Sequence, residues 1–165
     1  VTVRSVSATL SFGTQYSRYD GYLITVRDVE LTKSYTTENY TGEVVEETAP
    51  DGKQWAFIDV RVKNGTGESK LSPTSQDFFI LSGNSQIEST FISSEPVERG
   101  SAYEGGDLQP DVVRDGWIAY EVDGELTLDD IQVVYSASTF EGDVSVYWGE
   151  TPQQSLVGSI WQLLR

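Results

Sequence analysis

Acidic side chains are the groups in this sequence best suited to bind a metal ion. Two turn-rich stretches, YEGGDLQPDVVRDG and DGELTLDD, hold the densest acids: Glu104, Asp107, Asp111, Asp115, Asp123, Glu125, Asp129 and Asp130. Ca²⁺ takes roughly six to eight oxygen ligands, which loops can supply. Neither stretch has the D-x-D-x-D-G frame of an EF-hand. Solvated acidic loops are therefore the favoured interpretation, a Ca²⁺ site is the alternative, and we expect no metal or cofactor.

Two Asn-Xaa-Thr triplets, Asn39-Tyr40-Thr41 and Asn64-Gly65-Thr66, match the acceptor signal for N-linked glycans. Triplets this short also occur by chance. Asn64-Gly65 is in addition a favourable turn pair, because both residues tolerate positive φ. A turn and a glycan are compatible at Asn64 only where its side chain points outward. Asn39, in a polar loop, is the more accessible of the two candidate glycosylation sites.

Several tyrosines near Gly- and Ser-rich turns could stack on sugar rings. They are Tyr16, Tyr19, Tyr35, Tyr40 and Tyr103. Tyrosine also commonly borders β-sheets with its hydroxyl in water, and this is the favoured interpretation. A glycosidase would require two carboxylates that converge in a cleft, and no local motif indicates such a pair.

Cys, His and Met are absent from the 165 residues. This excludes the usual haem, iron–sulfur, zinc and copper sites. It also excludes Ser–His and Cys–His nucleophile pairs, so we expect no catalytic residues and no enzyme activity. Because no disulfide can form, the fold must rest on its core.

The charge balance is strongly acidic, with 26 Asp and Glu against 11 Lys and Arg and a net charge of −15. A field of this sign repels nucleic acid and acidic membranes. The acids are dispersed from Asp20 to Glu150. Dispersal favours a surface adapted to high salt over a convergent site for a cation or a basic partner. At molar salt the Debye length is about 3 Å, so the self-repulsion is screened.

Turn residues separate about eight alternating or apolar runs, a pattern typical of an antiparallel β-sandwich. The predicted strands are 2–12, 22–35, 54–64, 78–82, 86–91, 116–122, 131–136 and 144–148. The length suits one domain over residues 1–165. No apolar run approaches the roughly 18 residues that span a bilayer. The chain begins at Val1 without Met or an apolar signal segment, which indicates a mature or trimmed chain.

The run 54–64 is the clearest strand. Its first half is apolar on both faces, and one face is apolar throughout: Ala56, Ile58, Val60 and Val62. The run 116–122 behaves similarly. We expect these two strands at the centre of the sandwich and Trp117 largely buried in it.

The run 22–35 contains a slip of one residue in its alternation. Tyr22, Ile24 and Val26 are in phase, and Val29 and Leu31 are in phase with each other. A β-bulge near Arg27–Asp28 would return both sets to one face.

The C-terminal TPQQSLVGSIWQLLR departs from the β pattern. Thr151 can cap a short helix that starts at Pro152, with Leu156, Ile160 and Leu164 at helical spacing. The alternative is a last short strand in SIWQL.

The order of these features resembles the DUF4352 domains, also called telokin-like or immunoglobulin-like. The segments that carry the resemblance are GKQWAFIDVRVKN, SQDFFILSGNSQ and LQPDVVRDGWIAYEV. The family usually has Pro-Gly before its Gly-Trp strand, whereas this chain has Pro110-Asp111. The acidic, Lys-poor composition is similar to that of haloarchaeal surface proteins.

The resemblance implies an extracytoplasmic immunoglobulin-like sandwich, often lipid-anchored through an upstream segment, and it adds no site residues. We therefore expect a non-catalytic binding or structural module, attached to the cell surface of an organism of high-salt environments. Its partner would be a protein or a surface polymer, with no nucleic acid, no membrane span and a possible lipid anchor upstream of Val1. The alternative is a carbohydrate-binding module that uses exposed Tyr residues.

Overall fold

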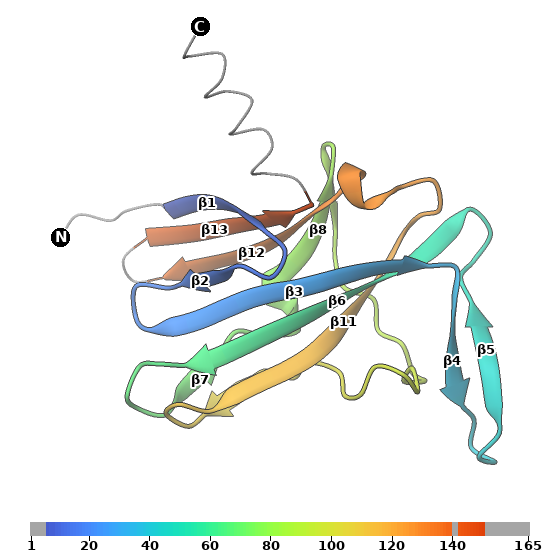
Figure 1. The fold of residues 1–165 in the computed structure, drawn as a ribbon, viewed down its shortest axis with the longest axis horizontal. Coiled ribbons are helices and arrows are strands. Elements are labelled where there is room, and N and C mark those ends of the chain that lie inside the picture. The colour runs from blue at the N-terminus through green and yellow to red at the C-terminus, as the bar shows by residue number, and fades with distance from the viewer. Residues whose placement is uncertain (1–5, 140–141, 151–165) are drawn as a thin grey trace, which may run out of the picture.

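Thirteen strands and two single-turn 3-10 helices make up the computed structural model over the described residues, 6–139 and 142–150 (Figure 1). The strands are β1 Val6–Ser11, β2 Gln15–Ser17, β3 Tyr22–Thr32, β4 Ser34–Glu38, β5 Val44–Thr48, β6 Lys53–Asn64, β7 Lys70–Ser72, β8 Phe78–Ser82, β9 Ser85–Ile87, β10 Gly106–Leu108, β11 Val113–Asp123, β12 Gln132–Thr139 and β13 Gly142–Gly149. The 3-10 helices are η1 Ser75–Asp77 and η2 Leu128–Asp130.

Two large sheets form a sandwich, which confirms the predicted all-β class. Their strand orders are β1-β13-β12-β8-β9 and β11-β6-β3-β2. The pairs β4-β5 and β10-β7 form separate two-stranded sheets, and the β4–β5 hairpin projects from the sandwich at the far end of β3 (Figure 1). Within the described part of the chain, no helix is long and apolar enough to cross a membrane.

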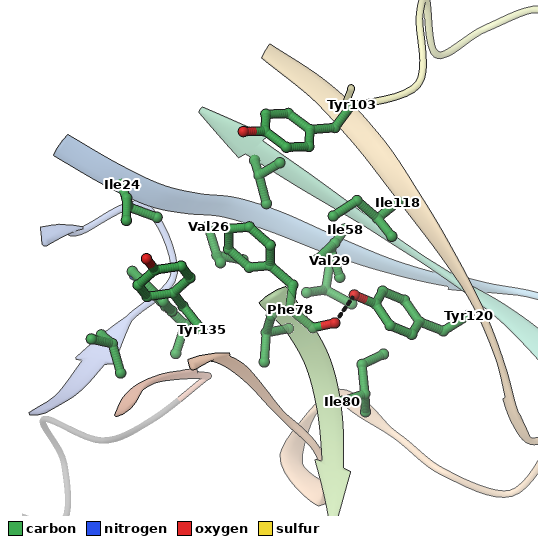
Figure 2. Packing of buried hydrophobic residues seen from close by; sticks show 14 of the residues in the cluster. Ile24, Val26, Val29, Ile58, Phe78, Ile80, Tyr103, Ile118, Tyr120 and Tyr135 are labelled. Atoms are coloured by element: carbon green, nitrogen blue, oxygen red, sulfur yellow. Dashed lines mark hydrogen bonds between the residues drawn. The ribbon is translucent and has the colours of Figure 1, made fainter. Parts of the chain in front are cut away.

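The main core lies between the two large sheets (Figure 2). Ile58 of β6 and Phe78 of β8 belong to this core and are fully buried. The hydroxyl of Tyr120 donates a hydrogen bond of 3.0 Å to the carbonyl of Phe78, so the ring is buried with its polar atom satisfied. Strand alternation delivers these side chains to one face because successive residues point to opposite sides.

The predicted bulge is present in β3. The pairing of β3 with β6 shifts between Val26 and Asp28, so that Arg27 is the extra residue. Val26 and Val29 are consequently both buried in the main core. The slip in the sequence and the slip in the ladder coincide because the bulge keeps the apolar side chains on one face.

The prediction of two central strands is right for β6 and wrong for β11. Strand β6 pairs with β3 on one side and β11 on the other, whereas β11 is the last strand of its sheet. Ala102 forms a single parallel bridge to Trp117 on the outer side of β11. A strand that is apolar on both faces has the pattern of a central strand. Here β11 is at the edge of its sheet, and an irregular segment that includes Ala102 packs against it.

Several predicted strand limits are also wrong. The run 22–35 divides at Lys33, because β4 leaves the sheet to pair with β5. The run 86–91 retains only β9, and Phe91 beyond it is 90% exposed. Of the run 2–12, the structure describes Val6 onward, and β1 pairs parallel to β13 in an otherwise antiparallel sheet. The predicted C-terminal helix and its alternative strand lie outside the described residues.

The turn before the Gly-Trp strand tolerates the replacement of the family's usual glycine. Asp111 has a φ of 64°, the left-handed region that Asp can adopt. Its amide donates to the carbonyl of Asn64 at 2.7 Å, and the amide of Asn64 donates to the carbonyl of Val112 at 3.1 Å. Pro110-Asp111 therefore makes the turn that Pro-Gly would make.

A partly buried ionic cluster closes the end of the sandwich at the β2–β3 turn. Arg18 forms a two-pronged pair with Asp20 at 2.8 and 2.7 Å and donates to the Tyr135 hydroxyl at 2.6 Å. Lys70 adds a bond of 3.1 Å to Asp20. Burial alone would raise the pKa of Asp20, but the hydrogen bonds and charges of Arg18 and Lys70 outweigh it and lower the pKa to about 2. The cluster thus connects the β2–β3 turn, β7 and β12.

Candidate functional site

A second aromatic cluster lies on the outer face of the β11-β6-β3-β2 sheet. Its buried members are Tyr35, Ala49, Trp55, Phe57, Trp117 and Ala119. The rings meet edge to face: Tyr35 and Phe57 have centroids 5.5 Å apart, and Phe57 and Trp117 are 5.8 Å apart. Edge-to-face contact places the positive ring edge against the negative ring face. Trp117 is therefore buried as predicted, but outside the space between the large sheets.

Residues 88–105, which we call the covering segment, run across this outer cluster without a strand of their own. Tyr103 donates its amide to the carbonyl of Trp117 at 2.8 Å, and the Trp117 indole donates to the carbonyl of Gly100 at 3.0 Å. The backbones approach so closely at Gly116 that a Cβ there would collide with the backbone of Tyr103. The glycine of the Gly-Trp pair is thus required for the segment to pack against β11.

Arg99 fastens the middle of the covering segment to the sheet. Its guanidinium lies over the Phe57 ring, 4.4 Å from the centroid, and pairs with Glu30 at 2.6 Å. Only 11% of the Arg99 side chain is exposed. Arg99 is the one basic residue between Lys70 and Arg114 in the sequence. That isolation is the only signal from which its role could have been predicted.

Next to Arg99 lies a carboxyl with altered acidity. Partial burial raises the pKa of Asp59, while the charge of Arg99 opposes the shift and that of Asp28 adds to it. Asp28 stands directly opposite Asp59 in the ladder. The like-charged pair accounts for part of the raised pKa, because two neighbouring carboxylates resist joint ionisation.

An open groove of about 750 Å³ lies between the β4–β5 hairpin and the covering segment. Its lining residues are Thr37, Glu38, Asn39, Tyr40, Ser93, Ser94, Glu95, Pro96, Val97 and Gly100. The walls are joined by two hydrogen bonds: the Thr37 hydroxyl donates to the Glu95 carbonyl at 2.8 Å, and the Val97 amide donates to the Thr36 carbonyl at 3.0 Å. Tyr40 on the hairpin wall is completely exposed. The groove is a fixed concave surface with one unshielded aromatic ring.

The structure does not bring the predicted acidic loops together. Among the described residues, no group of three acidic side chains is placed to hold a metal ion. Asp115 pairs with Arg61 at 2.8 Å, Asp123 pairs with Lys53 at 2.8 Å, and Asp130 accepts the Thr127 amide at the start of η2. These acids balance nearby cations or cap turns.

The five tyrosines considered for a sugar-binding platform do not lie together. Tyr35 belongs to the outer cluster and Tyr103 to the main core, so neither ring is available for the alternative of stacking on a sugar. Burial raises the pKa of Tyr103 to about 12, and its hydroxyl donates to the Pro73 carbonyl. Tyr16 is half-buried, and Tyr19 lies in the β2–β3 turn at the opposite end of β3 from the hairpin (Figure 1). Tyr40 alone of the five faces the groove.

The two glycan-acceptor candidates have different surroundings. Asn64 closes β6 and has no exposed surface, so the structure contradicts an outward-pointing side chain there. Asn39 lies in the connection between β4 and β5 and lines the groove. Asn64 is still paired as the last residue of β6, and neither Asn64 nor Gly65 has the positive φ that the turn interpretation assumed; in this connection the positive φ is at Gly67.

Comparison with known sequences and folds places the chain in a family. The sequence profile of a domain of unknown function, DUF4352, matches residues 16–144. The chain belongs to the DUF4352 family. No curated protein sequence matches it.

Solved structures with this fold are distant in sequence. The Bacillus subtilis protein YjhA is 17% identical, with a TM-score of 0.58 over 84% of this chain and 99% of its own. A β-sandwich protein of Clostridium difficile is 11% identical, with a TM-score of 0.51 over 89% and 97%. The B. subtilis protein YcdA, described as a putative lipoprotein, is 16% identical, with a TM-score of 0.53 over 88% of this chain. This chain spans 41% of YcdA. At such identities the likeness concerns the fold.

Proposed function

We propose that this DUF4352 domain is a non-catalytic binding module at the cell surface, outside the cytoplasm, in an organism that lives at high salt. The observation that carries the proposal is the groove between the β4–β5 hairpin and the covering segment. Its walls are held in place by the Thr37–Glu95 and Val97–Thr36 hydrogen bonds, so a ligand would meet a formed surface. A formed surface lowers the entropy cost of binding.

The groove fits an extended polymer better than a small enclosed ligand, because it is open to solvent. Tyr40 and Val97 offer apolar contact, and Glu38 and Glu95 offer hydrogen-bond acceptors. The surface location is supported by the lipoprotein description of YcdA. A lipid anchor would then precede Val1 in the full protein.

A non-catalytic role is supported by composition and by the pairing of charges. The sequence has no His and no Cys. The carboxylates Asp20, Asp115 and Asp123 are occupied by Arg or Lys partners. Asp59 has a raised pKa, but it lies beside the contact of Arg99 that holds the covering segment on the sheet. We therefore assign Asp59 a structural role.

A carbohydrate ligand is the second candidate, and Tyr40 is the observation that favours it. A fully exposed ring in a groove wall can stack on a sugar face. The five-tyrosine platform is not required for this, since one ring beside hydrogen-bonding side chains can suffice.

Binding to isolated cell envelopes of the source organism in molar KCl tests the proposal. Tyr40→Ser should weaken sedimentation of the domain with envelopes, whereas the matched control Tyr19→Ser should leave it unchanged. Competition by soluble envelope polysaccharide would identify the sugar ligand, and competition only by envelope protein would exclude it. Equal binding by both variants, or no binding by the native chain, would overturn the assignment of the groove.

A melting series tests the high-salt part of the proposal. The net charge of −15 makes the folded state self-repulsive, and monovalent salt screens this repulsion. The thermal midpoint should rise steadily from low salt to beyond about 1 M KCl. Micromolar CaCl₂ at matched ionic strength should add little. A flat KCl response with a large, saturable Ca²⁺ shift would replace the solvent explanation by a metal site.

A further inference from the structure

The two Asn-Xaa-Thr triplets share one local geometry. In the first, the amide and hydroxyl of Thr41 donate to Oδ1 of Asn39 at 3.0 and 2.6 Å. In the second, the amide and hydroxyl of Thr66 donate to Oδ1 of Asn64 at 2.9 and 2.7 Å. Sequence and local turn geometry therefore do not distinguish the two asparagines. Any difference in their chemistry must come from the amide nitrogen, which is the atom that carries an N-linked glycan.

The amide nitrogen of Asn64 is fully engaged. Its Nδ2 donates to the carbonyls of Glu68 at 2.8 Å and Leu108 at 2.7 Å, and the side chain is completely buried. Both Nδ2 protons are used in these bonds. Glycosylation would replace one of these protons and break at least one of the two bonds, and a side chain with no exposed surface leaves no room for a sugar, so modification would be costly. Asn64 is therefore a residue that joins β6 to β10 through its side chain.

The amide nitrogen of Asn39 is accessible. Oδ1 takes a third bond, from the amide of Glu43 at 3.0 Å, while Nδ2 makes no hydrogen bond to any described residue. The neighbours Tyr40 to Glu43 are all exposed, and the hairpin projects away from the sandwich (Figure 1). The Asn39 side chain is half-buried in the groove wall, but its Nδ2 is not a buried atom, so the carbonyl oxygen is held by three donors while the nitrogen remains open to approach.

We propose that Asn39 is the acceptor of an N-linked oligosaccharide on this domain and that Asn64 is not modified. Nδ2 of Asn39 attacks the anomeric carbon of an oligosaccharide carried on a lipid phosphate. The bond between that carbon and the phosphate oxygen breaks, and its electron pair leaves with the lipid phosphate. One Nδ2 proton passes to a base of the transferring enzyme. The product is an N-glycosidic bond at the tip of the β4–β5 hairpin.

The glycan would stand at the rim of the groove, because Asn39 and Tyr40 line the same wall. The inference nevertheless rests on access to Nδ2 and not on the groove's ligand. Tyr40→Ser keeps an Asn-Xaa-Thr triplet, so the envelope-binding test and the glycan test fail separately.

Peptide mass spectrometry of the chain isolated from cells that naturally export it tests the proposal. Cleavage after Lys33, Lys53, Lys63 and Lys70 gives peptides 34–53 and 64–70, each with a single triplet. We expect a glycan mass on peptide 34–53 and none on 64–70. An unmodified 34–53 peptide, or a glycan on 64–70, would overturn the assignment.

Variants separate glycosylation from folding. Thr41→Ala should abolish the glycan and Thr41→Ser should retain it, since a hydroxyl at this position completes the acceptor triplet. Thr66→Ala, the matched change at the other triplet, should leave the glycan mass unchanged. Circular dichroism should give a folded β spectrum for all three. A glycan that persists in Thr41→Ala contradicts N-linked attachment at Asn39.

A last comparison tests burial as the cause of the difference. Synthetic peptides 34–45 and 59–70, offered to a purified oligosaccharyltransferase with its lipid-linked oligosaccharide, should both be modified. The folded, unglycosylated chain offered to the same enzyme should be modified at Asn39 alone. If the enzyme does not modify peptide 59–70 either, burial of Asn64 in the folded chain is not what prevents its modification, and that part of the inference is wrong.

Discussion

The inner and outer faces of the β11-β6-β3-β2 sheet bury similar side chains against different partners. On the inner face, Ile58 and Tyr120 pack against a second sheet whose strands are themselves regularly hydrogen-bonded. On the outer face, Phe57 and Trp117 pack against the covering segment, which contacts the sheet through a few backbone bonds and Arg99. Both faces are buried, although the outer cluster is slightly more exposed, and only the inner partner has a hydrogen-bonded ladder of its own.

Polar groups are satisfied to different degrees on the two faces. In the main core, the Trp148 indole donates to the Thr14 carbonyl at 2.8 Å and the Tyr120 hydroxyl to the Phe78 carbonyl at 3.0 Å. In the outer cluster, Trp55 Nε1 is buried with no hydrogen-bond partner among the described residues. A buried donor without a partner costs about 1–3 kcal/mol. The outer cluster is therefore the region more easily opened.

The largest effect is expected from truncating the inner core. Phe78→Ala removes a fully buried ring between the two sheets and should lower the free energy of unfolding by about 3–5 kcal/mol. Because both sheets depend on this contact, amide-hydrogen exchange should accelerate in strands of both. Urea unfolding followed by fluorescence gives the magnitude. Acceleration confined to β8 would contradict a single shared core.

Trp117→Ala should lower the free energy of unfolding by about 3 kcal/mol, the lower end of the range for large aromatic residues. The loss is at the lower end because the covering segment can move to fill part of the cavity. Exchange should accelerate chiefly in residues 88–105. Trp117→Phe, which keeps the ring but not the bond to Gly100, is the matched control and should cost less. A loss below about 1 kcal/mol in Trp117→Ala would make the outer cluster a surface feature.

Acid should weaken the ionic cluster at the β2–β3 turn by protonating Asp20. The pKa of Asp20 is lowered to about 2 in the folded chain from its ordinary value of 3.8. The stabilisation is thus complete above pH 3.8 and is lost as the pH falls toward 2. The shift corresponds to about 2 kcal/mol. The free energies of unfolding of the native chain and of Asp20→Asn, measured in urea, should differ above pH 4 and converge near pH 2. A difference that does not change with pH would show that protonation of Asp20 is not linked to folding.

Arg99→Ala should loosen the covering segment with a cost of about 1 kcal/mol, since stacking on Phe57 contributes and the partly exposed ion pair to Glu30 adds little. Protease cleavage within residues 88–105 should become faster. Arg99→Lys keeps the charge and loses the planar stack, so its cleavage rate should lie between those of the native chain and of Arg99→Ala. Unchanged cleavage in Arg99→Ala would show that backbone bonds alone hold the segment.

The smallest effect is expected from Trp55→Phe. The change removes the unpartnered indole donor and keeps an aromatic ring, so loss of packing and relief of the buried polar group should offset to within about 1 kcal/mol. Thermal melting beside Trp148→Phe, which breaks a satisfied bond, gives the comparison. A cost for Trp55→Phe equal to that for Trp148→Phe would remove the proposed difference between the faces.

Local patterns predicted those features that depend on neighbouring residues in the sequence. The alternation in 54–64 identified β6 and its buried face, and the slip at Arg27–Asp28 identified the bulge. Asn64-Gly65 identified the end of β6 but not the backbone geometry that follows, because the positive φ is at Gly67. Side-chain direction alternates strictly along a strand, so these properties are written in a few consecutive residues.

The sequence alone therefore determined the all-β class, the inner face of β6, the bulge and the acidic surface. The tertiary structure decided that β11 lies at a sheet edge, that the covering segment buries Trp117, and that Arg99 holds this segment. It also decided which of two equivalent triplets leaves its amide nitrogen free. Each of these depends on contacts between residues far apart in the chain, and alternation, which reports only which way a side chain points, does not specify what will cover it.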